Sequence, residues 1–217
     1  MAHLLHIDSS ALTSGSVSKE VSTTFRKSWQ QAHPDGAVTY RDLGTDPVPP
    51  LLEASIMAGF TPEEARTPEQ VAAFAARQEL VEEVLAADAY LLSVPMYNWG
   101  VPATFKAWLD QILVVGRTAD LSGTPPLAGR PATLVLSYGG GYDEGTPREG
   151  WDFVQPFLET VLGKAMGLDV TVIKAQLTLA ERNPAMAELI PASIQQREAA
   201  HVAADQHART VLAALGV

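Results

Sequence analysis

Hydroxyl side chains crowd a stretch that follows a short apolar run near the start of the chain. Residues 10–18 hold five serines or threonines and one glycine, directly before the amphipathic pattern of a helix. The first N–H groups of a helix are unpaired and carry a partial positive charge, so they attract an anion. The stretch is therefore a candidate phosphate site made of hydroxyls and backbone amides, with Lys19 as its only cation. The alternative is a plain helix start that Ser16 or Ser18 caps.

A second candidate loop, Tyr97-Asn98-Trp99-Gly100, follows an uncharged apolar run over 89–95. Such a run is typical of a strand buried on both faces. Pro95 ends it, because proline donates nothing to a sheet ladder. The loop offers flat rings and amide groups, which suit a flat aromatic cofactor. The alternative is an ordinary strand-to-helix turn whose aromatic side chains pack on the core.

Glycines mark a third loop, Ser137-Tyr138-Gly139-Gly140, at the end of the apolar run 131–137. Without a Cβ, glycine lets a ligand approach the backbone closely, although a flexible turn would use the same residues. Each of the three loops is a modest signal by itself. Together they favour a common ligand site, because loops at the carboxyl ends of parallel strands meet at one edge of a sheet.

Other familiar chemistries lack their residues in this chain. There is no G-x-x-x-x-G-K-[ST] or G-x-G-x-x-G phosphate loop and no G-x-S-x-G nucleophile elbow. The five histidines stand at no metal-ligand spacing, and His201 and His207 are expected on the solvated face of the last helix. Asp8 could act as a general base, but a strand-end carboxylate beside serines favours a hydrogen-bonding role.

Strands and helices alternate along the chain, which predicts an α/β fold with a parallel sheet covered on both faces. The expected strands are 3–8, 37–43, 89–95, 131–137 and 169–174. The expected helices are 19–32, a long one from Pro68, 104–114, 151–165 and 192–214. The first places Val21, Phe25 and Trp29 on one apolar face. The apolar face of the second comprises Val71, Phe74, Leu80, Val81, Val84 and Leu85.

Two irregular segments interrupt this alternation. Residues 44–68 are rich in proline, with room for a short helix over 52–59, and 116–129 form another loop. Long loops in compact domains usually cover a site or contact a partner. No repeat or composition boundary divides the chain, so residues 1–217 are expected to form a single domain.

The balance of charge argues against two classes of partner. Lys and Arg total 15 against 25 Asp and Glu, a formal charge of −10. Nucleic acids and anionic membranes both attract basic surfaces, so neither is expected as a ligand. The chain has no cysteine, no apolar stretch of about 18 residues and no basic leader of the secretory kind. A cytoplasmic protein is therefore expected.

Taken together, the three loops resemble those of a known family. Their motifs are similar to those of the FMN-dependent, NADH-using azoreductases and quinone reductases of bacteria. The matching segments are Ser9-Ser10, Ser16-Val17-Ser18, Tyr40-Arg41-Asp42-Leu43, Pro95-Met96-Tyr97-Asn98-Trp99 and Ser137-Tyr138-Gly139-Gly140. The likeness covers nearly the whole chain. It implies a flavodoxin-like three-layer sandwich with a five-stranded parallel sheet in the order 2-1-3-4-5, and a homodimer with two active sites at its interface.

The resemblance also implies a role for each motif. The residues that would hold the FMN phosphate are Ser10, Ser16, Val17 and Ser18. Those that would line the flavin ring system are Pro95, Met96, Tyr97, Asn98 and Trp99. Those that would close over another side of the ring are Ser137, Tyr138, Gly139 and Gly140.

Three features depart from the family pattern. Trp99 stands where phenylalanine is commonest, which makes the wall beside the flavin bulkier. Tyr138 stands where many members have arginine, which removes a cation near the cofactor and could change its potential. Segment 117–122 lacks the aromatic residues that many relatives direct towards the substrate pocket.

The activity implied by the resemblance is a ping-pong oxidation of NADH or NADPH. After nicotinamide leaves, a quinone, azo or nitroaromatic compound takes two electrons. The flavin supplies the chemistry, so no catalytic side chain is expected.

Two other classes of protein stay open. One is a flavodoxin-type electron carrier without a substrate site, whose acidic charge would suit a basic partner. The other is a fold relative that has lost its flavin and serves as an interaction protein.

Overall fold

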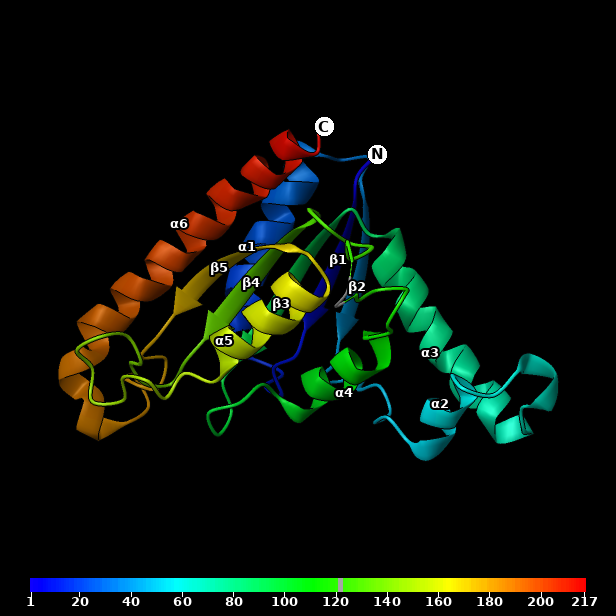
Figure 1. The fold of residues 1–217 in the computed structure, drawn as a ribbon. Helices are drawn as coiled ribbons and strands as arrows, with labels where there is room; N and C mark the ends of the chain where they lie inside the picture. The colour runs from blue at the N-terminus through cyan, green and yellow to red at the C-terminus, as the bar shows by residue number, and fades with distance from the viewer. Residues whose placement is uncertain (121–122) are drawn as a thin grey trace.

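Five parallel strands form the sheet at the centre of the molecule (Figure 1). The computed structural model describes residues 1–120 and 123–217. The strands are β1 (His3–Asp8), β2 (Ala37–Asp42), β3 (Ala89–Pro95), β4 (Pro131–Ser137) and β5 (Asp169–Ala175). Their order is β2-β1-β3-β4-β5, each parallel to its neighbours. This confirms the predicted flavodoxin-like sheet, with the uncharged β3 fully buried at its centre.

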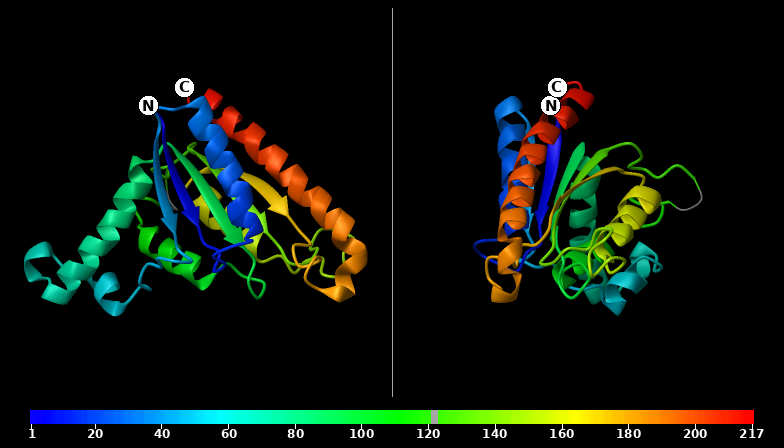
Figure 2. Two further views of the ribbon diagram at one scale, coloured as in Figure 1. Left: turned by 180° about the vertical axis from the view of Figure 1, so that it is seen from behind. Right: turned by 90° about the vertical axis from the view of Figure 1, so that its left-hand side faces the viewer.

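Helices cover both faces of the sheet and make three layers (Figure 2). The first face carries α1 (Val17–Ala32) and α6 (Ile190–Ala214). The second carries α3 (Pro68–Ala86), α4 (Ala103–Ile112) and α5 (Val154–Leu158), which continues as a π-helix over Glu159–Ala165. Successive strand residues point to opposite faces. Leu4 therefore belongs to the core under α1 and α6, and Leu5 to the core under the other three helices.

Helices α1 and α6 pack along each other. On α1, Val21, Phe25 and Trp29 recur every four residues and are fully buried, as their spacing predicts. The buried alanines of α6 recur at the same spacing: Ala200, Ala204 and Ala208. Because these side chains are small, the two helices approach closely and both contact the sheet.

The two histidines of α6 do not lie on a solvated face, so that expectation is wrong. Nδ1 of His201 lies 2.8 Å from Oγ1 of Thr24 on α1. The ring of His207 packs beside Phe25, with centroids 6.2 Å apart, and burial lowers the pKa of His207. The reason is that α6 is long and runs along α1, so side chains flanking its apolar row also contact that helix.

The helix expected over 151–165 begins later, at Val154. Oδ1 of Asp152 accepts the N–H groups of Val154 and Gln155, at 3.0 and 3.1 Å, and so caps the helix at that point. Trp151 and Phe153 consequently stay outside the core and are exposed.

An arm formed by residues 52–76 projects from the edge of the sheet (Figure 1). It contains α2 (Glu53–Ala58), a 3₁₀ turn (Glu63–Ala65) and the first half of α3. Only the second half of α3 packs on the core, where Leu80 and Val84 are buried. Val71, which was expected on the apolar face of this helix, is 51% exposed, because α3 extends beyond the strands that it covers. Within the described residues, no helix is both long and apolar enough to cross a bilayer.

Candidate functional site

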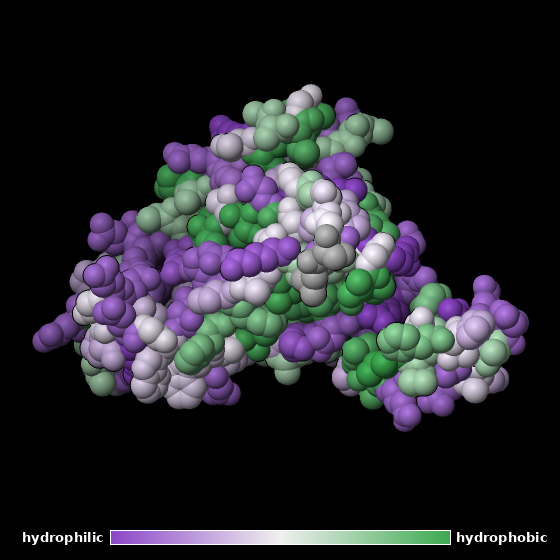
Figure 3. Space-filling model, in the orientation of Figure 1, coloured by the Kyte–Doolittle hydropathy of each residue, from purple (hydrophilic) through white to green (hydrophobic). Residues whose placement is uncertain are grey.

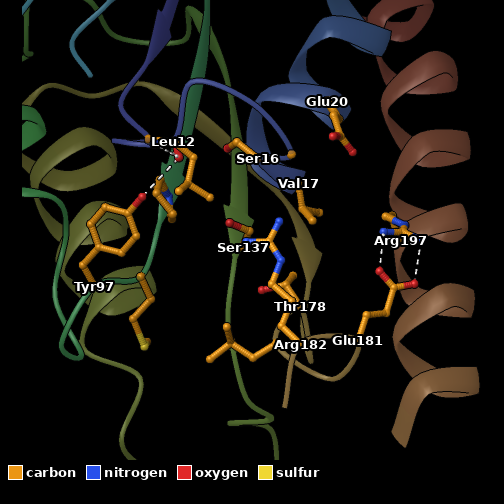
Figure 4. A pocket seen from close by; sticks show the side chains of 16 residues that line it. Leu12, Ser16, Val17, Glu20, Tyr97, Ser137, Thr178, Glu181, Arg182 and Arg197 are labelled. Atoms are coloured by element: carbon orange, nitrogen blue, oxygen red, sulfur yellow. Dashed lines mark hydrogen bonds and ion pairs between the residues drawn. The ribbon is translucent and has the colours of Figure 1, made fainter. Parts of the chain in front are cut away.

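The loops after β1, β3 and β4 meet at the carboxyl edge of the sheet and enclose a cavity of about 390 Å³ (Figure 4). The first loop (9–16) follows β1, the second loop (96–100) follows β3, and the third loop (138–142) follows β4. A fourth loop (176–183), which follows β5 and leads into a 3₁₀ turn (Pro184–Leu189), forms another wall. The lining residues are Ser10, Leu12, Gly15, Ser16, Val17, Glu20, Pro95, Met96, Tyr97, Ser137, Gly139, Thr178, Leu179, Glu181, Arg182 and Arg197.

The start of α1 forms one end of this cavity. Ser16 caps the helix, because its Oγ accepts the N–H of Lys19 at 3.5 Å. The buried Ser18 places its Oγ 3.3 Å from that of Ser16. The N–H groups of Val17 and Ser18 have no acceptor within the described residues. Capping and anion binding are therefore compatible, since the cap uses a different N–H. Lys19 itself pairs with Asp42 at 2.7 Å and is not among the lining residues.

Tyr97 joins the second loop to the first. Its hydroxyl lies 3.1 Å from Oγ of Ser10 and accepts the N–H of Ala11 at 3.1 Å. The first loop is also tied to β3, because Oγ of Ser9 donates to the carbonyl of Ser93 at 2.7 Å. These contacts fix the spacing of two walls of the cavity.

The second loop is a tight turn with an unusual backbone. Tyr97 and Gly100 exchange two backbone hydrogen bonds of 3.0 Å. Between them Asn98 and Trp99 have φ angles of 49° and 62°, the pattern of a type I′ turn. Asparagine tolerates a positive φ, whereas a tryptophan there is strained by about 1–2 kcal/mol. The N–H groups of Asn98 and Trp99 have no acceptor in the described part of the chain, so both are free to bind a ligand.

Side chains from other segments pack closely against the glycines of the third loop. A Cβ on Gly139 would lie 2.7 Å from Cδ1 of Leu179, on the fourth loop. A Cβ on Gly140 would lie 2.7 Å from Nη1 of Arg148. The carbonyl of Ser137 accepts the N–H of Met96 at 2.8 Å and joins the third loop to the second. The guanidinium of Arg148 thus places a cation beside the third loop, even though Tyr138 stands where many relatives have arginine.

The side chain of Tyr138 turns away from the cavity into the core under α5. It is 1% exposed, and its hydroxyl donates to Oδ2 of Asp152 at 3.0 Å. Burial, together with the nearby Asp152 carboxylate, raises the pKa of this phenol far above its usual value. The Tyr138 ring is thus not placed to touch a ligand in the cavity, and its role here is to anchor the third loop.

Asn98, Trp99 and Gly140 line an adjoining cavity of about 260 Å³. The two cavities share three lining residues: Met96, Gly139 and Leu179. The structure thus brings the expected residues together along one trough, with hydroxyls and the α1 terminus at one end and aromatic and amide groups at the other. Ser18 and Tyr138 are the two expected residues whose side chains are absent from both linings.

Sequence reasoning missed the fourth loop and its residues Leu179, Glu181 and Arg182. A signal for it existed, because a loop after β5 in a parallel sheet must also emerge at the carboxyl edge. Arg148, from the segment before α5, was missed as well, and its approach to Gly140 has no local sequence signal.

Asp8 is part of a buried hydrogen-bond network below the first loop. Its carboxylate accepts from His6 Nε2, the Ser22 hydroxyl and the Tyr40 hydroxyl, at 3.1, 3.0 and 2.9 Å. Burial acts to raise the pKa of Asp8, but these hydrogen bonds and the His6 ring outweigh it and lower the pKa. Asp8 is 2% exposed and does not line the cavity. This arrangement agrees with the hydrogen-bonding role expected for it.

The fold and the loop cluster define a flavodoxin-like protein. Residues 2–204 match the model of the family described by its flavodoxin-like fold, so the chain belongs to that family. It is 48% identical over 205 residues to an FMN-dependent NADH:quinone oxidoreductase of Frankia casuarinae, covering 94% of this chain and 96% of the relative. It is 49% identical over 202 residues to one of Streptomyces coelicolor, covering 93% and 91%. The resemblance carried by the loop motifs is confirmed.

Solved structures share the architecture at much lower identity. An azoreductase from Bacillus anthracis superposes with a TM-score of 0.84 at 19% identity, covering 97% of this chain and all of that one. An FMN-dependent NADH-azoreductase of the same species, in complex with FMN, gives a TM-score of 0.80 at 19% identity and covers 96% of this chain. At these identities the likeness establishes the fold.

Proposed function

We propose that this protein is an FMN-dependent oxidoreductase that transfers two electrons from NADH to a quinone, with azo and nitroaromatic compounds as further acceptors. The observation that carries the proposal is the trough at the carboxyl edge, which joins a helix N-terminus to an aromatic turn. The relatives at 48% and 49% identity bear the name of this activity.

The donor groups of the trough fit FMN. The free N–H groups of Val17 and Ser18 and the hydroxyl of Ser16 suit a phosphate. At the other end, Asn98 and Trp99 offer free N–H groups and flat surfaces to the ring system. Bound FMN would supply the redox chemistry, taking a hydride from NADH and returning two electrons to the acceptor.

The protein's own part is binding and electrostatic stabilisation. N–H donors held by the rigid turn between Tyr97 and Gly100 would face the negative charge that develops on the ring system and stabilise it. The Tyr97 hydroxyl keeps the first and second loops together. No side chain is assigned as nucleophile or general base, and Asp8 is too deeply buried to serve as one.

An acceptor site is available beside the trough. Trp99 and Trp151 are about half exposed and meet edge to face, with centroids 5.8 Å apart. Phe153 is exposed in an adjoining apolar hollow lined also by Phe157. These aromatic groups supply a surface for a flat acceptor. They would take the place of the aromatic residues that segment 117–122 lacks. Of that segment, 121–122 lie outside the described residues.

We also propose that the protein is a homodimer in the cytoplasm, with the arm in its interface. Apolar side chains of the arm are exposed to solvent: Leu52, Ile56, Met57, Phe60 and Val71. On the face drawn in Figure 3 the projecting end of the molecule shows hydrophobic surface among hydrophilic surface, and exposed apolar side chains of this kind are typical of an interface. Phe60→Glu is expected to convert the dimer to a monomer in light scattering, and Glu69→Gln, on the same arm, to leave it unchanged. A wild-type monomer would contradict the proposal.

The activity is tested with purified protein. A yellow preparation that releases FMN, and that consumes NADH when a quinone is added, is the expected result. A yellow protein that consumes no NADH would be an electron carrier. A colourless protein that takes up no added FMN would be an interaction protein, and the redox assignment would be wrong.

A further inference from the structure

We propose that Arg182 is a phosphate-binding residue, which closes over the FMN phosphate from the fourth loop. This inference rests on the proposed function and adds a binding residue that lies outside the three loop motifs.

The position of the Arg182 guanidinium carries the proposal. Its Nη2 lies 3.0 Å from the point that a Cβ on Gly15 would occupy. Gly15 precedes the N-cap Ser16, so the guanidinium lies at the start of α1. Figure 4 shows the Arg182 side chain among the residues that line the cavity, to which it extends from the fourth loop. A phosphate bound to the N–H groups of Val17 and Ser18 would thus lie beside this guanidinium.

The charges that line the cavity favour the same role. Arg197 is already engaged, since its Nη1 and Nη2 donate to Glu181 at 3.4 and 3.3 Å. Arg182 makes no side-chain hydrogen bond or ion pair within the described residues. Glu20 also lines the cavity, from the first turn of α1, and its carboxylate repels a phosphate. A free guanidinium offsets that repulsion and can bind phosphate through two parallel N–H donors.

The backbone holds Arg182 in this place. The N–H groups of Thr178 and Leu179 donate to the carbonyls of Tyr138 and Gly139, at 3.0 and 3.2 Å. The N–H of Arg182 donates to the carbonyl of Leu179 at 3.0 Å and closes a turn. The fourth loop is therefore fixed to the third loop, and the backbone of Arg182 is held at the edge of the cavity before a ligand binds.

The test compares FMN with riboflavin, which lacks the phosphate. Arg182→Ala is expected to weaken FMN binding about tenfold to hundredfold, the range of a charge-assisted hydrogen bond, while riboflavin affinity changes less than about twofold. Arg182→Lys keeps the charge and is expected to recover part of the affinity. The matched control is Arg209→Ala, because Arg209 is an exposed residue of α6 outside the cavity. Quenching of flavin fluorescence measures all four proteins.

Each outcome decides the inference. Equal weakening of FMN and riboflavin in Arg182→Ala would assign the residue a structural role and overturn it. Unchanged FMN affinity in that variant, with tight binding by the wild type, would overturn it and leave the proposed function standing. A wild-type protein that binds neither flavin would remove both proposals.

Discussion

Asp152 links the third loop to α5, so its loss affects two contacts at once. Oδ2 accepts the buried hydroxyl of Tyr138, and Oδ1 accepts the N–H groups of Val154 and Gln155. Asp152→Ala removes a helix cap worth about 1 kcal/mol. It also leaves the Tyr138 hydroxyl, in a side chain that is 1% exposed, without an acceptor, at about 1–3 kcal/mol. The free energy of unfolding should fall by about 2–4 kcal/mol.

Urea unfolding of a double-mutant cycle measures the two parts separately. Tyr138→Phe removes the hydroxyl and leaves the cap in place. The variant with both Asp152→Ala and Tyr138→Phe has no unpaired hydroxyl, so it should lose about 1–2 kcal/mol less than the sum of the single variants. Asp152→Asn keeps one oxygen for the cap but replaces the acceptor of the Tyr138 hydroxyl by an amide NH2, so it should lose about 1–3 kcal/mol and isolate that contact. Strictly additive losses would refute the coupling between loop and helix.

Three further predictions concern other sites. Replacing both Ser16 and Ser18 by leucine should weaken FMN binding about tenfold or more, as followed by flavin fluorescence; unchanged affinity would place the phosphate elsewhere. Trp99→Gly should be more stable than Trp99→Ala by about 0.5–1 kcal/mol in urea unfolding, because both lose the ring and only alanine keeps the strained φ. Equal stability would count against strain in the turn. Burial lowers the pKa of His207 below 6.5, so the unfolded chain binds more protons there. Stability should fall as the pH drops through and below that value, and His207→Phe should remove this part of the unfolding profile. A profile that the substitution leaves unchanged would contradict the effect.

Much of the fold follows from local patterns. The repeat of Val21, Phe25 and Trp29 and the uncharged run of β3 concern residues that are neighbours in the chain, and their conformation depends mainly on one another. A parallel sheet then places the loops after β1, β3 and β4 at one edge by topology alone. For this reason the candidate site could be located before any contact was known.

Which side chains reach the cavity depended on packing between distant segments. Tyr138 turns into the core because Asp152 offers its hydroxyl a partner there. Arg182 approaches Gly15 from the far end of the chain, and His207 meets Phe25 on another helix. Backbone periodicity arises between neighbouring residues and can be read from their order. The direction of a loop side chain depends on which distant surface lies beside it after folding, and no local spacing encodes that.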